Sequence, residues 1–296
     1  MNKKVKFAFI LAGIGILAAA ALRCVQMLCF FDYDTGFVTD SGLFTYIYCG
    51  TAIGVSLLCM LLCRVDKKLY ARVETKKNAA AGASALLQCV FLFLCAAALL
   101  RDFYLYRNNR PTYFVQASHV TAHLPFAVLT LLFAIVSLVF AITWLTGKGF
   151  PSGTGGFWAI GSVWGISYMI VTFMTYSAVA TTEENIFTVG GGAMMLLFLL
   201  SEGKLLSGAG GKKALRSTYV FGLPAAVLWM TYVISNTVLI IAGRGYATEM
   251  PYVIQLAMLC LSVHSLCLLL TVSGQRVSAK AEGALEENAL KDTENT

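Results

Sequence analysis

The sequence has little charge: Asp, Glu, Lys and Arg together make up 12% of its 296 residues, against about 25% in an ordinary soluble domain. No aspartate or glutamate is expected inside any of its eight long apolar stretches. Acids buried in membrane proteins usually carry ions or protons. Their absence would argue against cation-coupled transport and against acid–base catalysis at membrane depth.

Motifs for several enzyme classes are also missing. There is no P-loop, because the glycine-rich segment 153–156 is too short and lacks the lysine. No GxSxG elbow or HExxH helix is present. The last two apolar stretches contain no lysine that could hold retinal. We therefore predict no catalytic residue and no cofactor, and we favour a protein that is not an enzyme.

Neither cysteine nor histidine forms a metal-binding pattern. The nine cysteines lie in or beside apolar stretches without a CxxC pair, which argues against zinc and against a disulfide framework. His119 and His123 are four residues apart, but no glutamate lies between them and no third ligand is evident. No metal site is predicted.

The apolar stretches themselves are the main feature of the chain. About twenty apolar residues in a helix cross the roughly 30 Å hydrocarbon core of a bilayer. We predict an all-α, polytopic integral membrane bundle, a single transmembrane domain over residues 1–273, and a polar, disordered or weakly helical cytoplasmic tail over 274–296. The eight transmembrane helices are expected near 7–30, 43–63, 80–100, 122–146, 157–178, 186–202, 218–242 and 251–273.

Lysine and arginine gather in alternate loops, with nine of them between residue 3 and residue 77 on one side. By the positive-inside rule both termini are cytoplasmic. The same distribution accounts for the net charge of +7, so nucleic acid is not a predicted partner. The basic start and the segment FDYDTGF look bacterial, which favours the plasma membrane. The first helix resembles a signal peptide but continues past the small residues, so we expect it to be retained.

Two local patterns suggest how the helices pack. Similar short segments precede every second helix, beginning at Thr39, Thr121, Thr182 and Thr248; they suggest four repeated helical hairpins, although ordinary helix capping produces the same pattern. GxxxG pairs in the second and fifth helices, Gly50 with Gly54 and Gly161 with Gly165, predict close helix contacts within the bundle; Pro224 predicts a kink.

Five polar side chains are candidate ligand-binding residues. Arg23 lies near the outer face, where it could pair with Asp32, Asp34 or Asp40, or bind an anion with the help of Arg101 or Arg107. His264 is near the middle of the last helix, and no acid is expected at its depth; it could bond a hydroxyl or carbonyl, or relay a proton. The full set is Arg23, Arg101, Asn236, Gln255 and His264.

Three functions remain open. The first is a non-enzymatic, permease-like or accessory component that works in the lipid bilayer, alone or with a partner membrane protein. The second is a membrane-embedded enzyme acting on a lipid or isoprenoid substrate, with arginines and His264 around a phosphate. The third is a sensor or structural protein without a small ligand. The small-molecule ligand is not identified by the sequence.

Overall fold

The structure is a computed structural model that describes residues 3–32, 37–65, 77–108, 117–148, 156–176, 182–207, 211–244 and 250–294. In this part of the chain eight helices are long and apolar enough to cross a membrane. The predicted all-α polytopic bundle is therefore confirmed. Its one sheet among these residues is a two-stranded antiparallel pair of β1 (Phe31–Asp32) and β2 (Phe37–Val38), which links the first two helices.

Most helix boundaries lie within a few residues of the expected ones. The fifth and sixth spans are each composite, because a π-helical segment interrupts the α-helix. The elements in order are α1 (Lys3–Cys29), α2 (Leu43–Val65), α3 (Ala79–Asn108), α4 (Ala117–Thr146), α5 (Ala159–Val171), η2 (Thr172–Tyr176), α6 (Thr182–Asn185), η3 (Ile186–Gly190), α7 (Gly191–Leu206), α8 (Gly211–Ile241) and α9 (Tyr252–Glu294).

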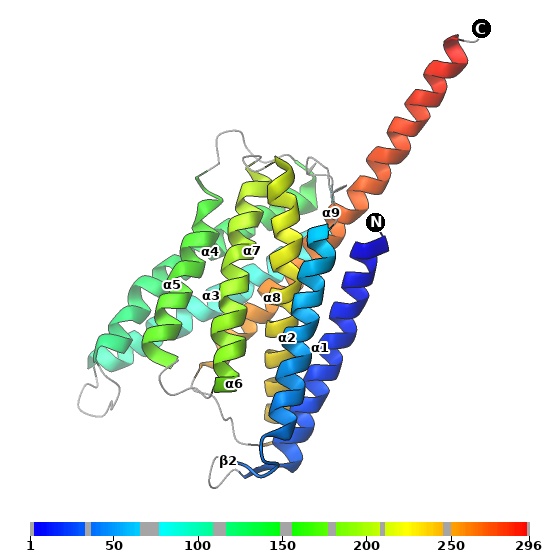
Figure 1. Cartoon of the computed structure of the whole chain (residues 1–296). Helices are drawn as coiled ribbons and strands as arrows, with labels where there is room; N and C mark the ends of the chain where they lie inside the picture. The colour runs from blue at the N-terminus through cyan, green and yellow to red at the C-terminus, as the bar shows by residue number, and fades with distance from the viewer. Residues whose placement is uncertain are drawn as a thin grey trace.

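Two helices extend well beyond their predicted ends. α3 continues to Asn108 because no glycine or proline interrupts the residues after position 100. α9 continues to Glu294 and projects past the bundle (Figure 1), where a tail was expected from residue 274 on. The composition of that segment explains the difference, since it is rich in alanine, glutamate, leucine and lysine, which are strong helix formers.

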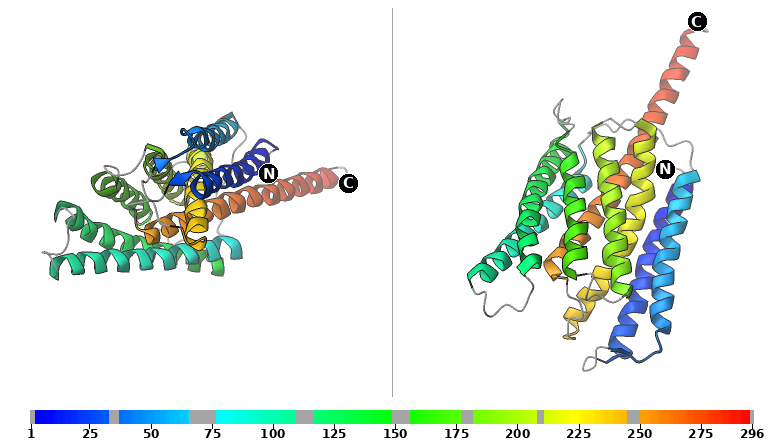
Figure 2. Two further views of the ribbon diagram at one scale, coloured as in Figure 1. Left: turned by 90° about the horizontal axis from the view of Figure 1, so that it is seen from below. Right: turned by 60° about the vertical axis from the view of Figure 1, so that its left-hand side comes forward.

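α8 is the central helix of the bundle and packs against α1, α2, α7 and α9. α9 lies between α8 and α3, while α4 and α5 close the far side (Figures 1 and 2). Each of the four consecutive helix pairs packs together, as hairpins require. Their origin by internal duplication stays a prediction. We call the end of the bundle at which α1 and α8 begin the basic end, after Lys3, Lys4, Lys6, Lys213 and Arg216.

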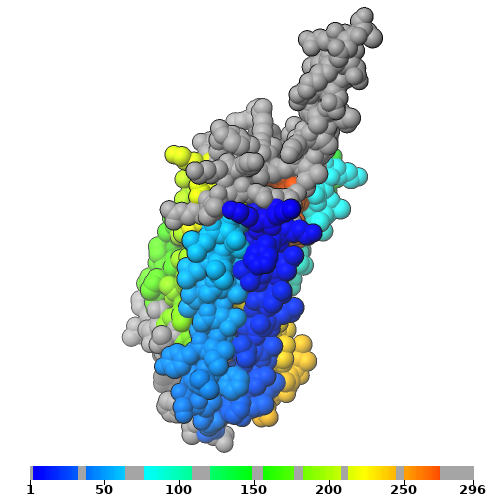
Figure 3. All heavy atoms as spheres, turned by 45° about the vertical axis from the view of Figure 1, so that its right-hand side comes forward, coloured from blue at the N-terminus to red at the C-terminus, as the bar shows by residue number. Residues whose placement is uncertain are grey.

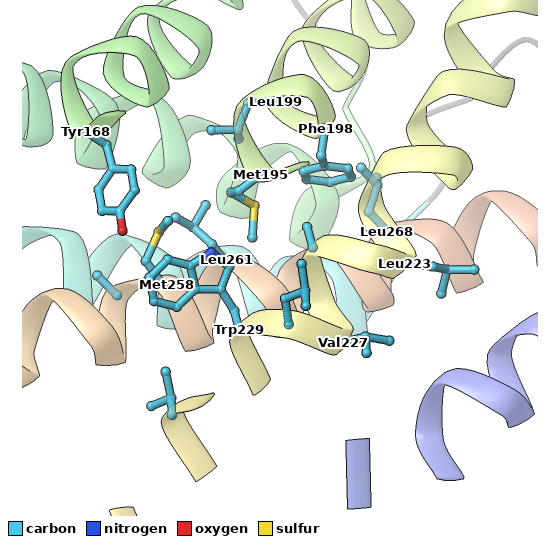
Figure 4. Close-up of a cluster of buried hydrophobic side chains, with 14 of the residues drawn as sticks. Tyr168, Met195, Phe198, Leu199, Leu223, Val227, Trp229, Met258, Leu261 and Leu268 are labelled. Atoms are coloured by element: carbon cyan, nitrogen blue, oxygen red, sulfur yellow. The ribbon is translucent and has the colours of Figure 1, made fainter. Parts of the chain in front are cut away.

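The centre of the bundle is a packed apolar core between α5, α7, α8 and α9 (Figure 4). Trp229, Phe198 and Leu261 are all fully buried there. Aromatic rings continue this core on both sides: Trp164 lies over Phe126, with 6.0 Å between ring centroids. Large buried rings contribute most to such packing, because each removes a large apolar area from contact with solvent and also prefers offset or edge contacts.

The two GxxxG pairs have different surroundings. A Cβ added at Gly161 would lie 3.0 Å from Phe133, and one at Gly165 would lie 2.9 Å from Leu196. This pair therefore lets α5 approach α4 and α7 closely, as predicted. For Gly50 and Gly54 the prediction of packing within the bundle is wrong, since an added Cβ would meet none of the described atoms within 4 Å.

The start of α2 is capped by Asp40 and not by the preceding threonine. The Asp40 carboxylate accepts hydrogen bonds from the backbone N–H groups of Gly42 (3.1 Å) and Phe44 (2.8 Å). Thr39 instead donates to the carbonyl of Phe30. Desolvation raises the pKa of the Asp40 carboxyl, but the backbone hydrogen bonds outweigh it, so the net effect is a pKa below the ordinary value.

Candidate functional site

Two glutamates are buried in the bundle, which contradicts the expectation of helices without acids. Glu184 in α6 is 7% exposed, and Glu202 near the end of α7 is 5% exposed. They lie at opposite ends of the same membrane span, on the order of 27 Å apart at about 1.5 Å per residue. The sequence did not indicate their burial, because each lies within about one turn of where the apolar stretch begins or ends, and acids at such positions normally lie at the membrane surface.

Glu202 forms an ion pair or hydrogen-bonded pair with His264. The Nε2 atom of His264 is 3.1 Å from the Oε1 atom of Glu202, and both side chains are almost completely buried. His264 was expected to have no acid at its depth, and this expectation is wrong. The physical reason is tertiary: α8 lies against both α7 and α9 and brings the two helices together.

The second ring nitrogen of His264 contacts a hydroxyl on a third helix. Its Nδ1 atom is 3.2 Å from the Oγ atom of Ser84 on α3, and that hydroxyl also lies 3.0 Å from the carbonyl of Ala81. Phe140 covers the imidazole from α4, with 6.3 Å between ring centroids. Ser84, Glu202 and His264 are referred to below as the His264 cluster.

The His264 cluster can hold its protons in two ways. The Ser84 hydroxyl carries one hydrogen, so it can donate either to His264 or to the carbonyl of Ala81, but not to both. If Ser84 donates to Nδ1, the imidazole is neutral and donates its Nε2 proton to Glu202. If Ser84 donates to Ala81, Nδ1 must be the donor, and the second proton of the His264–Glu202 pair lies either on Nε2 or on Glu202. The two states differ by one proton and a rotation of the Ser84 hydroxyl.

At the other end of the bundle, Arg23 is enclosed by aromatic rings. It is 3% exposed, and its Cζ atom lies 4.5 Å from the ring centroid of Tyr232 and 5.7 Å from that of Phe187. Phe187 stacks between Tyr232 and Tyr48. The hydroxyl of Tyr232 donates to Oε1 of Glu184 over 3.4 Å. These five residues are the Arg23 cluster.

Hydrogen bonding is incomplete in the Arg23 cluster. Within the part of the chain that the structure describes, the Nε and Nη1 atoms of Arg23 are buried without a hydrogen-bond partner. Glu184 and Glu183 lie close enough to act on the guanidinium through their charge. The cation is thus stabilised by ring faces and nearby acids, while several donors remain unused.

Arg23 contacts neither Asp32 nor Asp40, the two described acids that the sequence suggested. Asp40 caps α2, and Asp34 lies outside the described residues. A guanidinium can reach the membrane surface only if its helix leaves a path to that surface. Here α1 packs directly on α2 and α8, so the side chain is enclosed between them.

The remaining ligand-binding candidates do not converge on a single site. Asn236 donates to the Oε1 atom of Gln255 over 2.8 Å, and Gln255 donates to the carbonyl of Met250. This pair lies one helical turn from Tyr232 along α8, beside the Arg23 cluster. Arg101 is exposed on α3. His264 lies nine residues from Gln255 along α9, which is about 13 Å.

The sequence indicated Arg23 and His264 as ionisable residues inside apolar stretches, but it did not indicate their partners. Ser84, Glu202, Tyr48 and Glu184 each come from a helix distant in sequence, and none belongs to a recognisable motif. The only available signal was that the sixth apolar stretch has an acid close to each end.

Known proteins offer no guide to these clusters. No family model, no curated protein and no solved structure matches the chain. What the chain does must therefore be argued from its own residues, within a bundle of eight membrane-spanning helices.

Proposed function

We propose that this protein is a small-solute permease in which solute movement is linked to protonation of the His264 cluster. The observation that carries the proposal is the buried contact between His264 and Glu202. Ionisable groups are costly inside a membrane bundle, and those that occur there commonly form proton or ion pathways.

The Ser84 hydroxyl gives this site a simple way to accept a proton. In the neutral state it donates to Nδ1 of His264. When a proton arrives at Nδ1, the hydroxyl rotates to donate to Ala81, and Glu202 balances the new positive charge. Both ring nitrogens and the Ser84 hydroxyl keep a partner in both states, so neither state leaves the imidazole with an unsatisfied nitrogen.

The Arg23 cluster is the proposed contact point for the solute. Two nitrogens of Arg23, Nε and Nη1, have no hydrogen-bond partner among the described residues. Glu184 belongs to the same membrane span as Glu202, and the π-helical segments η2 and η3, which pack on each other, lie beside Glu184. Segments of π-helix often occur at functional sites. A shift of this span would change both clusters together.

We further propose that the protein lies in the plasma membrane with both termini in the cytoplasm. The basic end then faces inward. The His264 cluster belongs to the inner half of the bundle and the Arg23 cluster to the outer half.

The experiment is a proton-flux assay with the purified protein in liposomes that contain a pH-sensitive dye. Amino acids, sugars, organic acids and organic amines are added outside, one class at a time, and the initial rate of the change in internal pH is recorded. At least one class should produce a change that empty liposomes lack. Glu202→Gln and His264→Gln should each reduce that rate tenfold or more.

Ser201→Ala is the matched control, because Ser201 is the buried neighbour of Glu202 and bonds only the carbonyl of Leu197 in its own helix. It should keep nearly the full rate. A proton flux that is the same in Glu202→Gln as in Ser201→Ala would remove the His264 cluster from the pathway. A complete absence of solute-driven proton flux would reject the permease.

A further inference from the structure

The surface between α2 and α8 contains a long groove made of two adjoining hollows that share Leu57 and Met60. The hollow nearer the basic end has a volume of about 700 Å³, and the other about 570 Å³. Figure 3 shows α2 on the outside of the bundle, so this surface faces the hydrocarbon of the bilayer. Leu57 and Leu61 are more than half exposed along its edge.

The chemistry of the groove changes along its length. At the basic end it is lined by Lys213, Arg216 and Ser217. Beyond these residues its lining is mainly apolar as far as Leu228, with Ser56 and Asn185 as its polar members, and it comes from α2, η2, α6, η3, α7 and α8. None of the described residues that line either hollow is acidic. The groove therefore has a cationic mouth and an apolar body.

The length of the groove corresponds to one leaflet. From Arg216 to Leu228 on α8 is about 18 Å at 1.5 Å per residue, a little more than half of the roughly 30 Å hydrocarbon core. A transmembrane helix from a partner or a second copy would need a contact surface across the whole core. An acyl chain needs only the depth of one leaflet, with its headgroup at the membrane surface.

We propose that this groove binds an anionic phospholipid, with an acyl chain along α2 and α8 and the headgroup phosphate beside Lys213 and Arg216. Basic pockets at the end of a membrane helix attract anionic headgroups, and each cation contributes roughly a fivefold gain in affinity. The apolar body of the groove holds the chain without regard to the headgroup. Lys213 and Arg216 thus determine the preference for the headgroup, while the apolar residues of the groove bind the acyl chain.

Gly190 allows the apolar body to be tested separately. It lines the groove, and a Cβ added there would meet none of the described atoms within 4 Å. Gly190→Leu should therefore place its Cβ without a clash and extend its side chain into the groove. Gly13→Leu is the matched control, since Gly13 is equally open but lies on α1, away from the groove.

The experiment is native mass spectrometry of the full chain in detergent, titrated with phosphatidylglycerol or with phosphatidylcholine of the same acyl chains. Wild type should bind one phosphatidylglycerol at least tenfold more tightly than phosphatidylcholine. The double variant K213Q/R216Q should lose roughly 25-fold of the phosphatidylglycerol affinity, from two cations at fivefold each, and with it the preference. Lys148→Gln, which removes a cation outside the groove, should behave as wild type. Gly190→Leu should weaken both lipids several-fold.

Equal affinity of wild type for the two lipids would overturn the proposal, as would equal effects of K213Q/R216Q and Lys148→Gln. Competition by millimolar inorganic phosphate without an effect of Gly190→Leu would identify a free-anion site in place of a lipid site. Dimerisation that lipid abolishes would assign the groove to a second copy. If K213Q/R216Q does not fold, the single variants Lys213→Gln and Arg216→Gln give the same comparison at about fivefold each.

Discussion

The two buried clusters solve the same problem, an ionisable group inside an apolar bundle, in different ways. In the His264 cluster both ring nitrogens have a polar partner, one carboxylate and one hydroxyl. In the Arg23 cluster the guanidinium lies against two rings, and two of its nitrogens have no hydrogen-bond partner among the described residues. The imidazole is held by directional hydrogen bonds, and the guanidinium mainly by ring faces and nearby acids.

This difference bears on what each cluster can do. A hydrogen-bonded imidazole and carboxylate can exchange a proton while both ring nitrogens keep a partner. An arginine remains protonated under all ordinary conditions, so it cannot take part in such an exchange. Its unused donors suit recognition of another molecule. The proposed proton step therefore belongs to the His264 cluster and the proposed solute contact to the Arg23 cluster.

The largest expected effect comes from removing the acid of the His264 cluster. Glu202→Ala should destabilise the protein by about 3 kcal/mol, because it leaves the imidazole buried without its main partner. The measurement is thermal or denaturant unfolding in detergent. The double variant Glu202→Leu/His264→Leu should recover much of the loss, since it removes both polar groups at once.

If the loss in Glu202→Ala equals that in Ser201→Ala, the contact contributes nothing specific to stability. If the double variant loses the sum of the two single losses, Glu202 and His264 are not coupled. Either result would remove the contrast between the two clusters.

A smaller effect is expected from the cation of the Arg23 cluster. Arg23→Met keeps much of the side-chain volume and the contact with Tyr232, but it removes the cation–π attraction and the positive charge beside Glu184. The loss should be about 2 kcal/mol, as expected for a desolvated cation–π contact. Unfolding measured beside Glu202→Ala gives the comparison directly.

Glu184→Gln is the accompanying variant, because it removes the charge of the acid but keeps an oxygen for the Tyr232 hydroxyl. In the Arg23→Met background it should cost nothing or even stabilise. A loss for Arg23→Met larger than that for Glu202→Ala would show that the guanidinium is held by hydrogen bonds after all.

The smallest effect is expected at Asp40, an acid outside the bundle that serves as a reference for the two buried ones. Asp40→Ala should cost about 1 kcal/mol at neutral pH through loss of the α2 cap. Because the pKa of Asp40 is lowered in the folded protein, the stabilisation is complete above its ordinary pKa of about 3.9 and is lost as the pH falls through the lowered value.

The unfolding difference between wild type and Asp40→Ala should therefore shrink below about pH 4. Asp40→Asn keeps an oxygen that can cap the helix, so its difference from wild type should be smaller and should also shrink below about pH 4, while its difference from Asp40→Ala should not change with pH. A gap between wild type and Asp40→Ala that does not change with pH would mean that the charge plays no part in the cap.

Much of the fold could be predicted because hydropathy acts over short distances in the chain. The eight spans follow from the length of apolar stretches alone, and most of their ends fall close to the expected residues. The errors lie where a helix continues into polar residues, as in α3 and α9. There the end depends on helix propensity and packing, which an apolar window does not measure.

The candidate site could be predicted only in part, for the same reason. Arg23 and His264 stand out because a charged or ionisable residue interrupts an apolar stretch. Glu184 and Glu202 do not, because acids near helix ends normally lie at the membrane surface. Nothing local indicates that α1 would enclose Arg23 beside Glu184, or that α9 would bring His264 to Glu202.

The sequence by itself determined the class of the protein, the number of its membrane-spanning helices and the positions of its two interior cations, because each depends on which residues neighbour one another along the chain. Only the tertiary structure decided that Arg23 lies near the charges of Glu184 and Glu183 and that His264 contacts Glu202, since each arrangement brings together helices that are distant in sequence. It also decided which glycines pack and which are open, because the space beside a glycine belongs to another helix.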